Sequence, residues 1–236
     1  MGLLNVNIWK DLELIFSLLE HGATTLQWRW RFVIVTNTLV KFDIADIRAR
    51  FIDWYKNGAY TCDGLFDIGN ATARALNNGC DLTDEYSNGN GSLMRTVPLA
   101  FTNATDAEIE EVSAITHAHI TSRKCCVRMV HIARRLISGN CPQKVLDDID
   151  FDYSKQERDI KSGGFVLDTF EASLWCLANT SSYSECVLKA VNLGNDTDTT
   201  GAVAGALAGI VYGFDAIPAT WIETLRGKEI IDDCLF

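Results

Sequence analysis

The chain has 236 residues, of which 47% are hydrophobic, and its formal net charge is −10, with 21 Lys and Arg against 31 Asp and Glu. A chain of this length can bury one sizeable core. Since no Pro-, Gly- or Ser-rich linker interrupts it, we expect a single domain over residues 1–236. The acidic balance would repel a nucleic-acid backbone, so nucleic acid is not an expected partner.

Cysteine usage and the N-terminal segment bear on the location of the protein. The eight cysteines show no CxxC spacing and mostly fall on apolar helix faces, where a free thiol behaves as a small hydrophobe. The first thirty residues lack the pattern of a secretory signal, and no stretch of about 18 uninterrupted apolar residues occurs. We therefore expect a cytoplasmic protein with no membrane partner.

The dominant hydrophobic period along the chain is helical. Asp43 is a predicted N-cap and Gly58 a predicted stop for a first helix, and a second helix is predicted after Ser122 with its stop at Gly139. The inward positions are Ile44, Ile47, Phe51 and Trp54 in the first helix and Cys126, Met129, Val130, Ala133 and Ile137 in the second. This spacing favours amphipathic helices.

The helical pattern continues in the C-terminal half. Ser182 and Glu185 form a predicted capping box, and Pro218 begins the last predicted helix. Residues 28–40 differ, because they are β-branched and aromatic as in a strand, although no partner strand is evident. The predicted fold class is all-α.

An acidic turn precedes an apolar run at residues 199–213. Asp196 and Asp198 are two residues apart, so their side chains can converge only in an irregular turn, where Thr199 would add a hydroxyl oxygen. Such oxygen ligands suit Mg²⁺, Mn²⁺ or Ca²⁺. The alternative is that the two aspartates simply cap the following helix, as in most turns of this composition.

The apolar run carries glycine at every fourth position, namely 201, 205, 209 and 213. Each glycine weakens a helix by up to ~1 kcal/mol relative to alanine, so close contact with neighbouring helices must offset this cost. The pattern predicts a tightly buried central helix with the acidic turn at its N-terminal end.

Two further segments could contact a ligand. In residues 87–100, an Asn/Gly run permits positive φ and could form an anion cradle, with Arg95 adding charge; an ordinary turn before a core segment is the alternative. In residues 162–175, Gly163 and Gly164 let the backbone approach a ligand, and Phe165 offers either a stacking face or a core side chain. His117 and His119 are predicted on a helix, two apart, where they cannot share a metal.

Five motifs in order carry a resemblance: "FDIGNAT" (66–72), "NGNGSLMR" (88–95), "THAH" (116–119), "GGFVLDTFEASLW" (163–175) and "GNDTDTTGAVAGALAG" (194–209). Over residues 42–213 the chain resembles the ADP-ribosylglycohydrolase family, which includes dinitrogenase-reductase-activating glycohydrolase and the J1 crystallins. The resemblance implies a compact orthogonal helical bundle. It also implies hydrolysis of the bond between ADP-ribose and a protein side chain or small molecule, with two Mg²⁺ or Mn²⁺ ions.

The resemblance also implies roles for individual residues. Asp196, Asp198 and Thr199 match one half of a metal-ligand set, and Asp67 matches a catalytic acidic residue. The implied substrate-binding residues are Asn90, Gly91, Ser92, Met94, Arg95, His117, Gly164 and Phe165.

Residues 1–35 depart from the family pattern, because the "TDDT" or "SDDT" motif that supplies the other metal ligands is absent. With permitted codons, a shifted reading frame through residues 19–32 spells Trp-Ser-Asp-Asp-Thr-Ala-Met-Ala. We therefore hypothesise that residues 1–35 are translated out of frame. One ion or none would then bind well, and the alternatives to an active hydrolase are an impaired remnant that binds ADP-ribose, or a structural, crystallin-like protein.

Overall fold

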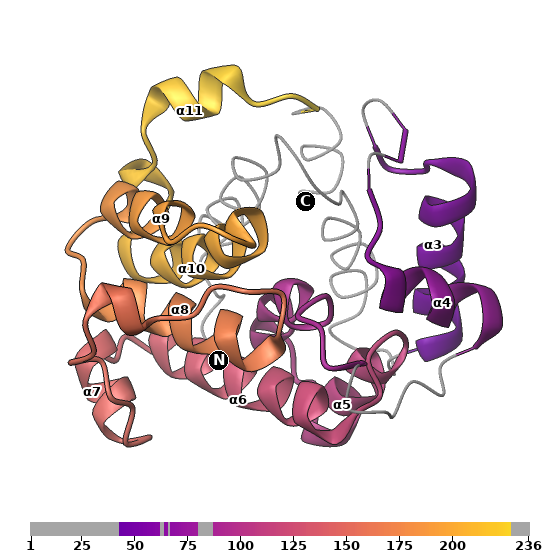
Figure 1. Ribbon diagram of the computed structural model, residues 1–236, viewed down its shortest axis with the longest axis horizontal. Helices are drawn as coiled ribbons and strands as arrows, with labels where there is room; N and C mark the ends of the chain where they lie inside the picture. The colour runs from indigo at the N-terminus through magenta and orange to yellow at the C-terminus, as the bar shows by residue number, and fades with distance from the viewer. Residues whose placement is uncertain (1–42, 62–63, 66, 80–86, 228–236) are drawn as a thin grey trace.

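The computed structural model describes residues 43–61, 64–65, 67–79 and 87–227, and every regular element in this part is a helix (Figure 1). The all-α prediction is confirmed, whereas the strand-like residues 28–40 lie outside the described residues. The α-helices are α3 (Ile44–Asn57), α4 (Asn70–Asn78), α5 (Asp106–Ala114), α6 (Ile120–Ile137), α7 (Pro142–Asp147), α8 (Val166–Ala178), α9 (Tyr183–Asn192), α10 (Thr197–Tyr212) and α11 (Ala219–Thr224). Short 3₁₀ turns are η3 (Leu93–Arg95), η4 (Val97–Phe101), η5 (Glu157–Asp159) and η6 (Phe214–Ala216).

Helix α3 begins and ends where its sequence signals predict. Asp43 Oδ1 accepts hydrogen bonds from the backbone N–H groups of Ala45 and Asp46, each at 3.0 Å. Gly58 adopts φ +61°, a left-handed conformation that favours glycine, and its N–H bonds the Trp54 carbonyl. Local capping chemistry therefore sets both ends of this helix.

One predicted helix start and one predicted capping box need correction. Helix α6 begins before Ser122, because His119 is its N-cap and its Nδ1 accepts from the Thr121 N–H at 3.2 Å. His117 and His119 consequently precede α6 and are not on a helix. At α9, Ser182 accepts from the Glu185 N–H as predicted, but the Glu185 carboxylate accepts from Ser181.

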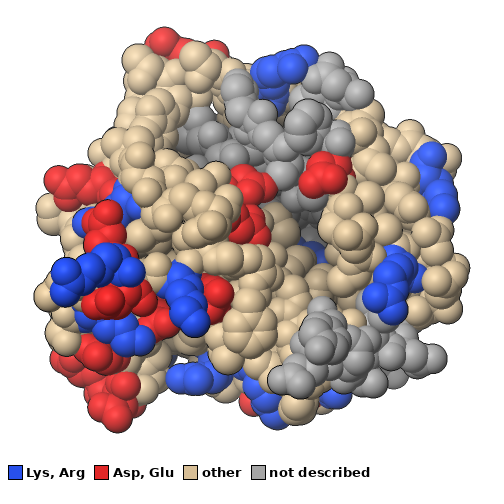
Figure 2. Space-filling model, viewed as in Figure 1, with Lys and Arg blue, Asp and Glu red and all other residues tan. Residues whose placement is uncertain are grey.

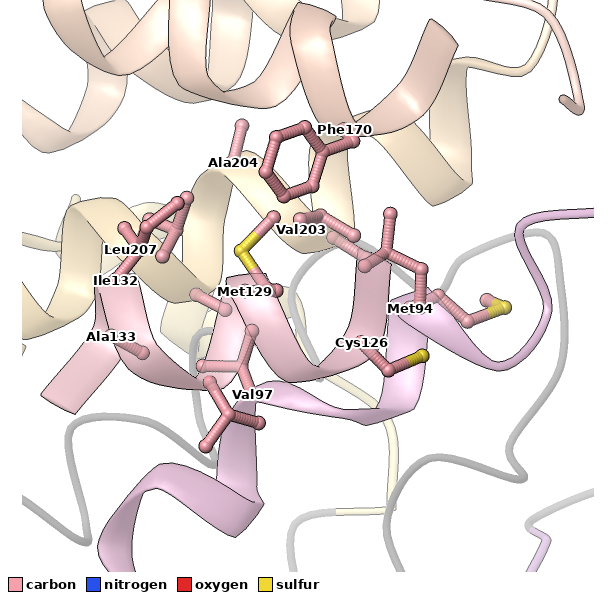
Figure 3. Close-up of a cluster of buried hydrophobic side chains, with 14 of the residues drawn as sticks. Met94, Val97, Cys126, Met129, Ile132, Ala133, Phe170, Val203, Ala204 and Leu207 are labelled. Atoms are coloured by element: carbon pink, nitrogen blue, oxygen red, sulfur yellow. The ribbon is translucent and has the colours of Figure 1, made fainter. Parts of the chain in front are cut away.

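Helix α10 is the buried centre of the fold, as its glycine stripe predicts. All its residues from Thr199 to Gly209 are buried, and it packs against α6, α8 and α9. Figure 3 shows Val203, Ala204 and Leu207 of α10 meeting Met129 of α6 and Phe170 of α8. The small α10 residues let these helices approach closely, which offsets the propensity cost of the glycines.

The helices surround a central region on one face of the molecule. In Figure 1, α3 and α4 lie on one side, α8, α9 and α10 on the other, and α5 and α6 along the lower edge. Turn η3 contacts α6 and α10, so the segment at residues 88–95 lies at the N-terminal end of the central helices. This arrangement brings the predicted motifs towards one another.

Other predictions concern thiols and membranes. The five described cysteines, Cys125, Cys126, Cys141, Cys176 and Cys186, are free thiols. Within the described residues, no helix combines the length and apolarity that crossing a membrane requires. The cytoplasmic location stays a prediction.

Candidate active site

A cavity of ≈ 350 Å³ lies between two walls and has the size of a small-molecule site. We call residues 88–95, 162–169 and 196–199 the α10 wall, and residues 67–72 the α4 wall. The lining residues are Trp54, Asp67, Ile68, Gly69, Asn70, Ala71, Thr72, Gly89, Asn90, Gly91, Met94, Arg95, His117, Gly164, Asp196, Asp198 and Thr199. Most of the residues predicted from the sequence are thus brought together at one cavity.

The acidic turn lies at the N-terminus of α10. Asp196 is the N-cap by position, yet its side chain makes no capping hydrogen bond. Its Oδ2 accepts instead from the Asn90 side-chain amide at 2.7 Å. Burial, together with the hydrogen bond and charge of Asp196, raises the pKa of Asp198. The Asp196 carboxylate is therefore directed towards the cavity and towards Asp198, a different arrangement from the capping alternative.

The segment at residues 162–166 forms main-chain hydrogen bonds with the other two parts of the α10 wall, residues 88–95 and 196–199. The Asn90 N–H donates to the Gly164 carbonyl, and the Asp196 N–H donates to the Ser162 carbonyl, both at 3.0 Å. Gly89 and Phe165 form an isolated antiparallel bridge. Because one extended segment bonds both neighbours, the acidic turn and residues 88–91 are positioned relative to each other by main-chain geometry.

Asn90 adds a side-chain link to this wall. Its Nδ2 donates both to Asp196 and to the Thr169 hydroxyl, the latter at 2.8 Å. The residue is buried, with 8% of its surface exposed, so both bonds form in surroundings of low dielectric. Asn90 orients an acidic side chain as well as lining the cavity.

His117 and Arg95 lie behind the Gly89–Gly91 turn. Burial, followed by the charge of Arg95, lowers the pKa of His117 to about 3, so its imidazole is neutral near pH 7. The Arg95 guanidinium is only 2% exposed and donates to the Gly91 carbonyl at 2.7 Å and the Thr116 hydroxyl at 2.6 Å. It also lies 4.9 Å from the Phe51 ring centroid. Arg95 therefore contributes to this end of the cavity mainly through its neighbours.

The α4 wall carries the third acidic residue of the cavity. Asp67 is exposed and precedes the Gly69 N-cap of α4. Asp67 lines the cavity from the α4 wall, and Asp196 and Asp198 line it from the α10 wall. Figure 2 shows acidic side chains on both sides of a hollow on this face of the molecule. The cavity mouth is thus acidic on two sides.

Two predicted residues are not among those that line the cavity. Ser92 is fully buried, and its hydroxyl faces Ser113 and Cys126 at 3.0 and 3.5 Å. Phe165 is 42% exposed at the start of α8 and lies outside the lining. Their substrate-binding roles stay predictions, with Ser92 placed as a support of the loop and Phe165 at the surface nearby.

Sequence reasoning missed several lining residues. The helical spacing predicts Trp54 as a core residue, and its side chain is only 2% exposed. Trp54 also lines the cavity, which the spacing does not indicate. Thr72 ends the "FDIGNAT" motif, and Gly89 belongs to the Asn/Gly run. The two motifs could have indicated Thr72 and Gly89 as lining residues, because helix starts and glycine-rich turns commonly contact ligands.

The donor set at the acidic turn fits a divalent cation only in part. Within the described part of the chain, no group of three His, Cys, Asp or Glu side chains is arranged to hold a metal ion. Two carboxylates and the Thr199 hydroxyl are nevertheless hard oxygen donors of the kind Mg²⁺ and Mn²⁺ prefer. These residues could supply some of the ligands, and others would have to complete the set.

A family model for ADP-ribosylglycohydrolase matches residues 11–235. The chain belongs to the ADP-ribosylglycohydrolase family. A solved chain described as an ADP-ribosylglycohydrolase-related protein complex superimposes with a TM-score of 0.74 at 23% identity, covering 98% of this chain and 94% of that one. This likeness shows the ADP-ribosylglycohydrolase fold.

Curated relatives of the ADP-ribosylglycohydrolase chain are more similar in sequence. The ADP-ribosylarginine hydrolase Tri1 of Serratia proteamaculans is 31% identical over 219 residues, which cover 82% of this chain and 60% of the relative. The ADP-ribosyl-(dinitrogen reductase) glycohydrolase of Rhodospirillum rubrum is 32% identical over 205 residues, covering 79% and 67%. The chain thus spans about 60% of the length of the Tri1 relative.

Proposed function

We propose that this chain binds an ADP-ribose conjugate in the cavity and hydrolyses the glycosidic bond between ADP-ribose and a modified side chain. The observation that carries the proposal is the hydrogen bond from the Asn90 side chain to Asp196. It links the predicted phosphate loop to the predicted metal ligands, and both line one cavity. Family membership supports the same reaction class.

The walls suggest how a ligand would lie. The loop at residues 89–95, with His117 and Gly164, would hold the diphosphate and distal ribose, and Phe165 would flank the adenine at the cavity rim. Asp67 would face the reacting bond from the α4 wall, where it could polarise a sugar hydroxyl or the attacking water. Buried Met94 and Trp54 would provide an apolar floor that limits access of bulk water.

Metal dependence is part of the proposal. Asp196, Asp198 and Thr199 would hold Mg²⁺ or Mn²⁺, which when bound supplies positive charge to the ribose oxygens as the bond breaks. The raised pKa of Asp198 supports this role, since two neighbouring, partly buried carboxylates gain from a cation that neutralises them. Asn90 would keep the Asp196 carboxylate in position for the ion.

We further propose arginine as the leaving group. The Tri1 relatives are named ADP-ribosylarginine hydrolases. A guanidinium also suits a cavity whose mouth carries carboxylates on both walls, whereas a serine hydroxyl gains less from that charge.

The direct test is the release of ADP-ribose from an arginine-modified peptide, measured chromatographically with Mg²⁺, with Mn²⁺ and with EDTA. We expect metal-dependent release, and slower release from a serine-modified peptide. Asp198→Asn, which keeps the shape of the side chain, serves as the matched inactive variant. Release that is equal in the parent and in Asp198→Asn would refute the proposed site.

A second candidate function is binding of ADP-ribose without turnover. It is favoured by the incomplete metal-ligand set of the described residues and by the missing N-terminal motif. Calorimetry with ADP-ribose separates the two candidates, because an impaired remnant binds the nucleotide and releases none from the peptide. Residues 1–35 lie outside the described residues, so the reading-frame hypothesis stays a prediction that the coding DNA across residues 15–40 decides.

A further inference from the structure

Two residues, Gly194 and Asn195, connect α9 to the acidic turn at the start of α10. Leu193 is the C-cap of α9 and Asp196 is by position the N-cap of α10, and the two helices pack against each other. Both connecting residues have positive φ, +83° for Gly194 and +57° for Asn195. Because side chains disfavour this backbone region, a connection of this kind persists only where surrounding residues hold it.

Ser162 holds this connection from a distant part of the chain. Its hydroxyl donates to the Gly194 carbonyl at 2.9 Å and lies 3.3 Å from the Leu193 carbonyl. The Asn195 side-chain amide donates back to the same hydroxyl at 3.3 Å, and the Asp196 N–H donates to the Ser162 carbonyl at 3.0 Å. Ser162 is 1% exposed, so these bonds are shielded from solvent. We call this set of contacts the serine clamp.

The backbone at Asp196 differs from that of the helix starts that a side chain caps. Asp43, Thr105, His119 and Ser182 each accept a hydrogen bond from their own helix, and their backbones are extended, with ψ between 94° and 162°. Asp196 has ψ 69° and makes no capping bond. Since Asp is among the preferred N-cap residues, an unrestrained Asp196 is expected to cap α10.

The Asp196 carboxylate lies in the cavity instead. Its Oδ2 accepts from the Asn90 side-chain amide at 2.7 Å, and a Cβ added to Gly164 would lie 3.4 Å from the same oxygen. Asn90, Gly164 and Asp196 all line the cavity. A carboxylate that turned back to cap α10 would leave this position, so the capped and the cavity-facing arrangements compete.

We infer that Ser162 and Asn195 are positioning residues, which hold Asp196 in the cavity and prevent it from capping α10. The inference rests on the proposed function for the task of Asp196 as a ligand of Mg²⁺ or Mn²⁺. Neither Ser162 nor Asn195 lines the cavity, so both act on a ligand through the acidic turn. The bond between the Asn90 N–H and the Gly164 carbonyl is separate from the clamp.

The first test is the affinity for Mn²⁺. Ser162→Ala removes the hydroxyl and keeps the main-chain bond to Asp196. We expect the Mn²⁺ affinity, measured from the EPR signal of free Mn²⁺, to fall about tenfold or more, as for other residues that orient a metal ligand. ADP-ribose affinity in EDTA, measured by calorimetry, should equal that of the parent, because the bond between Asn90 and Gly164 is kept.

Ser173→Ala is the matched control. Ser173 is fully buried, its hydroxyl also donates to a main-chain carbonyl, that of Phe170 at 3.0 Å, and it lies outside the cavity lining. The variant should lower the thermal midpoint and leave the Mn²⁺ affinity unchanged. Equal losses of Mn²⁺ affinity in Ser162→Ala and Ser173→Ala would overturn the inference, because a general loss of stability would then be responsible.

Asn195 allows a graded test at an exposed position. Asn195→Gly removes the amide and still adopts the left-handed backbone, whereas Asn195→Ala loses the amide and also opposes φ +57°. We expect a moderate loss of Mn²⁺ affinity for Asn195→Gly and a larger loss for Asn195→Ala. The opposite order would contradict the role of the turn. Should Ser162→Ala fail to fold, this pair carries the same comparison.

The position of Asp196 can also be followed in the metal-free protein. The Asn90 side-chain amide donates to Asp196 Oδ2, so its NMR resonances, assigned by their loss in Asn90→Ala, report where the carboxylate lies. These resonances should shift in Ser162→Ala, although Ser162 forms no bond with the Asn90 side chain, and they should stay in place in Ser173→Ala.

Unchanged Asn90 resonances in Ser162→Ala, or a parental Mn²⁺ affinity, would refute the serine clamp. A parent that binds no Mn²⁺, with Asn90 resonances that shift in Ser162→Ala, would refute the proposed metal dependence and support the clamp. The two proposals therefore fail separately.

Discussion

The two walls of the cavity are built in different ways. The α10 wall is joined by main-chain bonds from residues 162–164 to Asn90 and Asp196, and by the two side-chain bonds of Asn90. Among the residues that the structure describes, no hydrogen bond joins the α4 wall at residues 67–72 to the α10 wall. The α4 wall is held from behind, where Arg48 donates to the carbonyls of Ala75 and Leu76 at 3.2 Å.

This difference separates two tasks. The α10 wall holds its charged groups in fixed positions, as the proposed metal and sugar chemistry would require. The α4 wall offers exposed Asp67 and the helix N-terminus, and it can adjust to a ligand without breaking hydrogen bonds to the other wall. We expect changes in the α10 wall to affect turnover most, and changes behind the α4 wall to affect affinity.

The largest effect is expected from Asp196→Asn. The change removes one carboxylate charge at the proposed reacting centre and should lower the rate of ADP-ribose release by roughly 10²- to 10³-fold. Because Asp196 makes no capping bond and lies beside Asp198, the thermal midpoint should stay constant or rise slightly. A variant with the parental rate would show that the α10 wall has no such role.

The next effect is expected from Asn90→Ala. Losing the amide leaves the Thr169 hydroxyl and Asp196 without a donor, which should cost about 1–3 kcal/mol of unfolding free energy and at least ~10-fold in release. Asn179→Ala is the control, because its Nδ2 also donates twice, to Tyr153 and Trp175, away from the cavity. Equal losses of activity in both variants would mean that stability alone is responsible.

A smaller effect concerns the pH dependence of stability. The pKa of His117 is lowered to about 3, so the unfolded chain binds a proton below its ordinary pKa of 6.5 while the folded chain does not. The stability present above pH 6.5 is therefore lost progressively as the pH falls towards 3, by up to about 1.4 kcal/mol per pH unit for this group. In urea unfolding at two pH values in this window, His117→Gln should show a shallower fall than the parent, and an identical fall would contradict the burial of a neutral imidazole.

The smallest effects compare the support of the α4 wall with a remote cap. Arg48→Met should remove about 1 kcal/mol by leaving two carbonyls without their donor, and it should weaken ADP-ribose binding by loosening α4. Thr105→Ala removes a capping box at α5 for a similar ~1 kcal/mol. Calorimetry with ADP-ribose distinguishes the two variants, because only Arg48→Met should alter the affinity for ADP-ribose.

Helix ends set by neighbouring residues were predictable from the sequence. The caps of α3 are Asp43 and Gly58, and the N-cap of α11 is Pro218. Each of these residues ends or begins a helix through its own backbone conformation or through bonds within one turn, so the sequence nearby suffices to predict it. His119 escaped notice as the start of α6, because histidine is an uncommon N-cap whereas Ser122 is of a preferred type. Ser122 lies inside the helix, and its hydroxyl faces the Asn88 side chain at 3.3 Å.

The site was predictable as a set of motifs, and its internal contacts were not. The bond between Asn90 and Asp196 joins residues 106 apart, which no spacing rule relates. Orientation within a motif was also hidden, since Ser92 faces the interior while its neighbour Gly91 faces the cavity. Adjacent residues in a tight turn point in different directions, and only the packed fold decides between them.

The contacts of residues 162–164 with two distant segments have a consequence for how the cavity forms during folding. Their hydrogen-bond partners lie some 70 residues earlier and 30 residues later in the chain. Closing loops of this length costs conformational entropy, so we expect these contacts to form late in folding. The helices can form from local contacts long before these distant segments meet. In a refolding experiment, ADP-ribose binding should therefore return more slowly than the helical circular-dichroism signal.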